Sequence, residues 1–275
     1  PADGEASFRA TATDSAQPIS NALYASAGMV PRIPLLNLIG LPPRSDAFGY
    51  TCRLEEAAFE QADTVVPLTG DDEVIAIDLP FPFRFYGTEY NQAFVATNGH
   101  VNFLAANTSF TNAAIPVTAT PNAAIYPFWD DLFVDASASV RTASLGSAPN
   151  RRFVIEWRNV QFFSDATRRI DVNVVLHENG QILTQYRNIA NDGRERGNSA
   201  TLGIENDTGT DALRFSFNEA SLAPEPTVTS VRYTPPPLPP AHTVSGHVRD
   251  EGGRPIPNAS VTIEGTPITP ATTDG

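Results

Sequence analysis

The stretch from Leu79 to Phe103 constrains the fold of this chain more than any other. It begins LPFPFRFYG, where aromatic residues alternate with proline and arginine, as in a strand with one buried face. Pro82 has no N–H to donate to a neighbouring strand, so this strand should lie at a sheet edge or be kinked. The pair Asn98-Gly99 then follows an apolar segment and is typical of a two-residue type I′ hairpin turn. We therefore expect an all-β domain built around this aromatic face.

Hydrophobic alternation predicts further strands along most of the chain. The candidates are residues 49–54, 74–79, 151–163, 169–177, 200–206, 211–217 and 230–234. Along 169–177 the apolar residues at even-numbered positions should face the core, whereas Asp171, Asn173 and His177 should face solvent. Asn179-Gly180 predicts a second hairpin, and the polar loop between the strands at 200–206 and 211–217 predicts a third. Residues 55–63 could form one helical turn.

Strands at this spacing without intervening helices predict an antiparallel, jelly-roll-like β-sandwich. We assign this sandwich to residues 46–234, and PPPLPP begins a stiff linker at 235–241. Residues 242–275 contain two strand patterns joined by a Gly/Pro loop, which should be the start of a partial second β-sandwich. Residues 1–45 are interpreted as the end of a preceding β domain plus a linker, or as an extended arm that packs on this domain or a neighbour.

The composition excludes several classes of partner. A net charge of −13 argues against nucleic acid and against an anionic membrane surface, since both attract basic proteins. No uninterrupted apolar run approaches the ~20 residues of a membrane span. Cys52 is the only cysteine, so an intrachain disulfide is impossible. An acidic chain that has no lysine and is rich in Pro, Thr, Asn and Ala is typical of secreted bacterial proteins.

Two groups of acidic residues are candidates for calcium binding, because calcium takes six to eight oxygen ligands, often from loops. The first group, Asp130, Asp131 and Asp135, follows an apolar strand pattern. The second group comprises Glu205, Asp207 and Asp211. Neither group has the spacing of a dedicated calcium loop, and aspartates more often cap turns. Calcium at the first group is the metal prediction, and no other cofactor is expected.

The residues give no indication of catalysis. Asp130 and Asp131 are adjacent and should point apart, whereas a glycosidase needs two opposed carboxylates across a cleft. No G-x-S-x-G nucleophile motif occurs. The histidines are scattered, and those beside hairpin turns, His100 and His177, should be exposed. The adjacent pair Phe162-Phe163 must place one ring on each face of a strand, and an outward ring could contact a glycan or a protein.

An ordered series of motifs resembles a known module. The motifs are DAFGYT (46–51), LPFPFRFYG (79–87), VATNGHVNF (95–103), PNAAIYPFWDDL (121–132), RRFVIEWRNV (151–160), VVLHENGQILTQY (174–186), ATLGIENDTGTDALRFSFN (200–218) and SVRYT (230–234). Together they resemble a β-sandwich module that recurs in secreted bacterial proteins beside subtilisin-like proteases and is distantly similar to nidogen-type extracellular modules. Gln61 and His100 depart from the pattern, since aromatic residues are usual at both positions. Residues 242–275 resemble the start of a carboxypeptidase-regulatory-like domain, which is a transthyretin-like sandwich.

The resemblance implies a non-catalytic accessory module that acts in binding, spacing or attachment. Its parent would be a secreted or cell-surface multidomain bacterial protein, either a subtilisin-like protease or a surface protein, and its partner a protein or glycan at the cell surface. The alternative is a structural protomer of an extracellular fibre or adhesin that assembles with copies of itself by strand exchange. This alternative rests on an unpaired strand-like run at 5–13 and an apolar arm at 29–41.

Overall fold

The computed structural model describes residues 44–224, 229–238, 248–258, 260–261 and 271–272. The chain divides into two compact units, residues 1–236 and 237–275. The expectations for residues 1–43, including the strand-like run at 5–13 and the arm at 29–41, lie outside the described residues.

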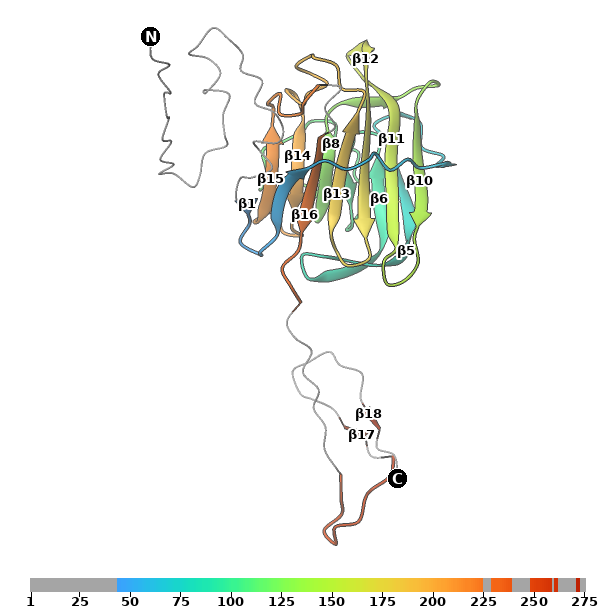
Figure 1. Cartoon of the computed structure of the whole chain (residues 1–275), viewed down its shortest axis with the longest axis vertical. Coiled ribbons are helices and arrows are strands. Elements are labelled where there is room, and N and C mark those ends of the chain that lie inside the picture. The colour runs from blue at the N-terminus through green and yellow to red at the C-terminus, as the bar shows by residue number, and fades with distance from the viewer. Residues whose placement is uncertain (1–43, 225–228, 239–247, 259, 262–270, 273–275) are drawn as a thin grey trace, which may run out of the picture. The chain divides into compact units, whose positions relative to one another are not determined.

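The first unit is an antiparallel β-sandwich, which confirms the predicted fold class (Figure 1). The large sheet has ten strands in the order β1-β2-β16-β13-β12-β11-β10-β3, with β9 pairing both β11 and β4. The small sheet has six strands in the order β15-β14-β8-β7-β6-β5. Apolar side chains from both sheets form one core. The strands are β1 (Arg44–Ser45), β2 (Thr51–Glu55), β3 (Thr64–Val65), β4 (Gly70–Asp71), β5 (Val74–Phe85), β6 (Thr88–Ala96), β7 (Val101–Asn102), β8 (Ala124–Trp129), β9 (Leu132–Val134), β10 (Ser139–Leu145), β11 (Arg152–Phe162), β12 (Asp165–His177), β13 (Ile182–Arg187), β14 (Thr201–Glu205), β15 (Ala212–Phe217) and β16 (Thr229–Thr234).

The aromatic run behaves as its pattern predicts. It forms the second half of β5, which lies at the edge of the small sheet. The pairing of β5 with β6 is interrupted between Asp78 and Phe83, around Pro82. Phe83 and Phe85 are fully buried, and the Phe85 ring centroid lies 5.2 Å from that of Phe103. The edge position and the interruption both follow from the missing proline N–H.

The hairpins occur at the predicted places, but the predicted type I′ turn is wrong. The Ala96 N–H donates to the His100 carbonyl at 3.0 Å, so three residues rather than two form the loop. Gly99 has φ 69°, whereas Asn98 keeps a negative φ. A Cβ on Gly99 would lie 2.0 Å from the Phe128 carbonyl oxygen, so only glycine fits this turn. The third hairpin, β14 with β15, is confirmed.

Residues 56–63, which we name the strap, cross the outer face of the large sheet from β2 to β3 (Figure 1). The prediction of a helical turn here is wrong, because the strap has no regular secondary structure. The prediction that Asp171 and Asn173 are exposed is also wrong. Both point away from the core, yet they are 3% and 0% exposed. Asn173 donates to the Glu60 carbonyl of the strap, and Asp171 is enclosed by Arg187, which stacks on the strap ring Phe59. The outer face of a sheet is thus buried under a crossing segment.

Residues 104–123, which we name the covering loop, lie over the small sheet. Ile115 from this loop packs with Ala124, Tyr126 and Trp129 in an apolar cluster separate from the main core. The Trp129 indole N–H donates to the Ser109 carbonyl at 2.8 Å. The prediction that His100 is exposed is wrong, since it is fully buried with its ring edge-on to Trp129 at 5.8 Å. His100 therefore occupies an interior position, as an aromatic residue would.

The second unit is described only in part. Arg249 and Pro255 form an isolated antiparallel bridge, and the Asp250 N–H donates to the Arg254 carbonyl at 2.9 Å. Strand β17 (Ser260–Val261) pairs with β18 (Ala271–Thr272). These pairings agree with strand patterns joined by a Gly/Pro loop, while the identity of this domain stays a prediction.

Candidate functional site

The predicted metal ligand Asp130 lies directly after β8 and is buried. One carboxylate oxygen accepts the backbone N–H of Asp131 at 2.8 Å, and the other accepts the Ser199 hydroxyl at 2.6 Å. Burial raises the pKa of Asp130, and these two hydrogen bonds oppose the rise. The carboxylate is therefore occupied in fixing the chain between β8 and β9.

Asp135 has a different environment. Its carboxylate forms an ion pair with the Arg169 guanidinium at 2.6 Å and accepts the Ser137 N–H at 3.1 Å. The hydrogen bond from Arg169 is the largest cause of its lowered pKa. Asp135 thus caps a turn and neutralises an arginine, as aspartates at strand ends commonly do.

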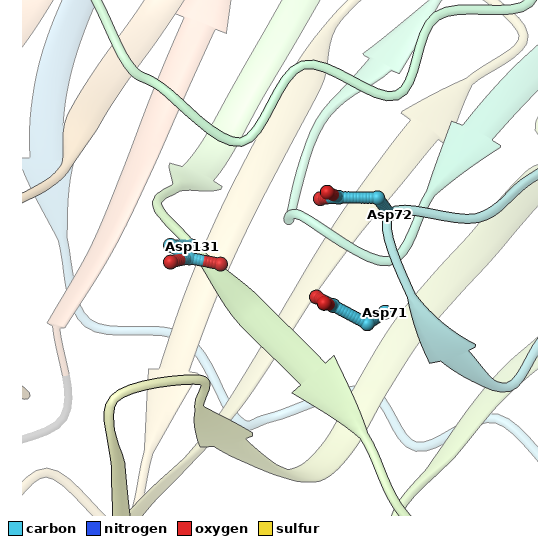
Figure 2. A group of neighbouring side chains, drawn as sticks. All are labelled: Asp71, Asp72 and Asp131. Carbon is cyan, nitrogen blue, oxygen red and sulfur yellow. The ribbon is translucent and has the colours of Figure 1, made fainter.

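Asp131 joins two aspartates that the sequence did not indicate as ligands. Carboxylate oxygens of Asp71, Asp72 and Asp131 all lie within 4.8 Å of one another, and Figure 2 shows the three side chains directed toward a common space. We name these residues the acidic cluster. Asp71 ends β4, which pairs with β9 in the register Asp71 opposite Phe133. This short pairing brings residues distant in sequence together.

The Asn98-Gly99 turn is hydrogen-bonded to the acidic cluster. The Asn98 amide N–H₂ donates to the Asp72 carboxylate at 2.7 Å, and its carbonyl oxygen accepts the Leu132 N–H at 2.9 Å. The same N–H₂ group donates to the Thr108 carbonyl of the covering loop at 3.2 Å. Asp72 itself adopts a left-handed backbone conformation with φ 53°. One buried asparagine therefore connects the turn, the cluster and the covering loop.

The aspartates of the acidic cluster repel one another electrostatically. Burial raises the pKa of Asp131, and the charges of Asp71, Asp72 and Asp130 raise it further, while Arg194 acts in the opposite direction. Burial likewise raises the pKa of Asp71, and the charge of Asp72 adds to this shift. One oxygen of Asp71 is shielded from solvent without a hydrogen-bond partner. The folded chain therefore holds these carboxylates together at a cost in free energy.

Carboxylates in this arrangement suit a hard cation, because calcium binds oxygen ligands. Of the predicted set, the structure brings only Asp131 into such a group, whereas Asp130 and Asp135 bond elsewhere. The signal that could have found the others is the sequence Gly70-Asp71-Asp72, a turn with paired carboxylates. Calcium binding stays a prediction.

The second acidic group holds backbone instead of gathering around one point. Glu205 is fully buried and accepts the Val117 N–H at 2.6 Å and the Tyr126 hydroxyl at 2.7 Å. Asp211 accepts the Phe48 N–H at 2.8 Å and so ties the loop after β1 to the small sheet. These contacts are those of structural residues.

An exposed aromatic ring lies beside the acidic cluster. Phe162 is fully buried and Phe163 is 54% exposed, which confirms that this pair places its rings on opposite faces. The Phe163 N–H donates to the Asp131 carbonyl at 3.0 Å, and its ring meets Phe133 edge-on at 6.5 Å. Because Asp71 and Phe133 are directly opposed, they share one face of the sheet. We name Phe133, Phe163 and the acidic cluster the aromatic–acidic surface.

Comparison with known proteins places the sandwich in a family. The model of the family described as "NIDO related" matches residues 49–237. Nidogen from Drosophila melanogaster is 29% identical over 134 residues, which cover 41% of this chain. The chain spans about a tenth of the length of that relative. No solved structure matches the chain significantly. Among the residues that the structure describes, no helix is long and apolar enough to span a membrane. Because the family model matches more than half of its residues, the chain belongs to the NIDO-related family.

Proposed function

We propose that this chain is a non-catalytic extracellular accessory module that serves in binding, spacing or attachment within a larger protein. The observation that carries the proposal is the family match over residues 49–237, which coincides with the β-sandwich. The location outside the cell and the accessory role are what the nidogen-type resemblance implies.

The chemistry of the described carboxylates supports a non-catalytic role. A catalytic carboxylate must face a substrate, whereas Asp130, Asp135 and Glu205 bond to neighbouring parts of the fold. The burial of His100 lowers its pKa to about 3, which removes it from proton transfer near neutral pH. These residues stabilise the sandwich.

The aromatic–acidic surface is where we place the contact with a partner. An exposed ring such as Phe163 offers apolar area, and the neighbouring aspartates offer hydrogen-bond acceptors. A surface protein or a glycan provides groups complementary to both. The ring of Phe110 in the covering loop is also exposed and serves as the control.

The parent protein that we propose is a secreted multidomain bacterial protein, either a subtilisin-like protease or a surface protein. Residues 242–275 would begin its carboxypeptidase-regulatory-like domain. Fibre assembly by strand exchange gains no support from the described residues. The edge strand β5 contains Pro80 and Pro82, and proline at an edge disfavours the addition of another strand.

The test is deletion of residues 44–238 from the full-length gene product. We expect hydrolysis of a small soluble substrate by the parent to continue, while its attachment to the cell surface is lost. Loss of activity toward the small substrate would refute the non-catalytic role, and unchanged attachment would refute the binding role. Phe163→Ser should weaken attachment, whereas Phe110→Ser should leave it unchanged.

A further inference from the structure

The last strand of the sandwich meets β2 at the point where the chain leaves the domain. Strand β16 pairs with β2 in the register from Ser230 opposite Glu55 to Thr234 opposite Thr51. Thr51 begins β2 and Thr234 ends β16, so these directly opposed residues mark one end of the seam between the two strands. Tension on the flanking chain therefore separates the seam from this end, one backbone pair after another.

Strand β2 is held more weakly than β16. Strand β16 pairs at five positions with β13 and at five with β2. On its other side β2 has only β1, which pairs with it at two positions. Breaking a few hydrogen bonds at a time costs little, because the net contribution of each one to stability is small. Under tension the pairing between β2 and β16 therefore breaks, so that β1 and β2 leave the sheet while β16 stays paired with β13.

The strap follows β2 directly, and side chains of the large sheet hold its backbone. The Glu60 N–H donates to Gln185 at 2.9 Å and the Ala62 N–H donates to Glu156 at 2.6 Å. The carbonyl of Glu60 accepts from Asn173 at 2.7 Å, and that of Ala58 accepts from Gln185 at 2.7 Å. Because most of these bonds go to the backbone of the strap, the sheet face binds an extended polypeptide through its peptide groups.

Removal of the strap uncovers polar groups and one small apolar cluster, in which Ala62 of the strap packs with Val154, Val175 and Leu183. Glu156, Asn173 and Gln185 are each 0% exposed and lie on the outer face of the large sheet. Arg187 stacks on the strap ring Phe59 at 4.3 Å, and Arg152 forms an ion pair with Glu60 at 3.0 Å. Release of β1 and β2 with the strap withdraws Tyr50 and Cys52 from the main core, whereas the other buried members of that core come from residues 66–233 and keep the principal stabilisation of the sandwich.

We propose that residues 44–63 are a tension-releasable layer that covers a site for an extended peptide. Pulling on the flanking chain peels β1 and β2 from β16 and lifts the strap, while the sandwich from β5 to β16 stays folded. The uncovered face then accepts an extended polypeptide in place of the strap. This inference does not depend on the proposed accessory function, because it concerns the domain itself.

Optical tweezers test the release of the layer. Handles are attached to the full chain through peptide tags inserted before Arg44 and after Leu238. We expect a first extension of about 70 Å for the 20 residues from 44 to 63, before a much larger one for the remaining sandwich. A single extension of the whole domain would overturn the proposal.

Two matched variants locate the first extension. Glu55 forms a two-point ion pair with Arg232 across the seam, with contacts at 2.6 and 2.9 Å. Glu178 forms a similar pair with Arg151 at 2.5 Å, away from the layer. Glu55→Ala should lower the force of the first extension and leave the second unchanged, and Glu178→Ala should not change the first. Equal effects of both variants would contradict the assignment.

A peptide of residues 56–63 tests the uncovered site. It is added while the chain is held between the two extensions, and it should slow the return of the layer. The control peptide has proline at the positions of Glu60 and Ala62, which removes the two N–H groups that bond to Gln185 and Glu156. No slowing by the first peptide, or equal slowing by both, would show that the face is not such a site.

Discussion

The two outer faces of the sandwich are covered by different chemistry. The strap on the large sheet and the covering loop on the small sheet are each held by a fully buried glutamate that accepts a backbone N–H. Glu156 accepts from Ala62 at 2.6 Å, and Glu205 accepts from Val117 at 2.6 Å. Glu156 also receives two hydrogen bonds from Arg158, both at 2.8 Å. Glu205 instead meets the Tyr126 hydroxyl at 2.7 Å.

The difference lies in the charge that each face keeps. The Tyr126 hydroxyl is 2.5 Å from the Pro121 carbonyl as well as 2.7 Å from Glu205, so one proton faces two acceptors. Glu205 has no basic partner in the described structure to offset its charge, and burial raises its pKa. The strap is thus fixed by a glutamate that is paired with Arg158, whereas the covering loop is fixed by apolar packing and by a glutamate that accepts hydrogen bonds without an arginine partner in the described structure.

The largest effect is expected for Glu156→Gln. This change removes the charge of a fully buried carboxylate that accepts two hydrogen bonds from Arg158, whose side chain is 28% exposed, and it should lower the free energy of unfolding by about 3 kcal/mol. Urea unfolding measures the loss. Hydrogen exchange at the Ala62 amide should also quicken. Glu178→Gln, at a more accessible pair with Arg151, should cost much less, because ion pairs open to solvent contribute little. Equal costs would contradict the importance of the buried charge.

His100→Phe should remove a pH dependence that belongs to the covering loop. Burial lowers the pKa of His100 to about 3, so below pH 6.5 the unfolded chain binds a proton that the folded chain does not. Stability from this residue is complete above pH 6.5 and falls by about 1.4 kcal/mol per pH unit as the pH decreases toward 3. Between pH 6.5 and pH 5 the variant should therefore lose about 2 kcal/mol less than the parent.

Urea unfolding at several pH values gives this slope. His177→Gln is the matched control, because burial and then Arg232 lower the pKa of His177 to about 4 on the large sheet. His177→Gln should remove the part of the pH dependence of stability that comes from His177. The effects of the two variants should add, since the two residues share no contact in the described structure. An unchanged slope in His100→Phe would show that the ring is protonated in the folded chain.

Glu205→Gln should have a small effect of opposite sign to Glu156→Gln. The amide oxygen can accept the Val117 N–H, and the amide N–H₂ can donate to Tyr126, which then donates to Pro121. Because the raised pKa of Glu205 means that ionisation is unfavourable in the folded chain, a neutral isostere should raise stability by up to about 1 kcal/mol at pH 7. Thermal unfolding measures the shift. A loss comparable to that of Glu156→Gln would erase the contrast between the two faces.

The sequence correctly predicted features that depend on residues adjacent in the chain, and it failed to predict the burial of side chains by segments that cross the sheets. Pro82 and the pair Phe162-Phe163 were interpreted correctly, because missing donors and alternation act locally. Asp171 and Asn173 alternate like solvent-facing residues, but both are buried, Asn173 under the strap and Asp171 beneath Arg187, which the strap ring Phe59 covers.

The acidic cluster was missed in part for a related reason. It depends on β4, a strand of two residues that is too short for a periodic pattern. Asp131 was identified from its own neighbourhood, while Asp71 and Asp72 reach it only through the pairing of β4 with β9. The sequence Gly70-Asp71-Asp72 indicates a turn with paired carboxylates, but it does not indicate that this turn lies beside Asp131.

Asp131→Asn, in the acidic cluster, should have the smallest effect on the free energy of unfolding. Removing this charge relieves repulsion with Asp71 and Asp72, so the variant should gain a few tenths of a kcal/mol at pH 7 without calcium. Asp207→Asn, at an exposed position away from the cluster, should give no change. If calcium binds the cluster, it should raise the melting temperature of the parent more than that of Asp131→Asn, because a ligand stabilises the state that binds it. Chelation should reverse that rise. An equal calcium response in both proteins would exclude Asp131 as a ligand. The structural role of the cluster would then be the contact of Asp72 with Asn98, which also donates to the Thr108 carbonyl of the covering loop.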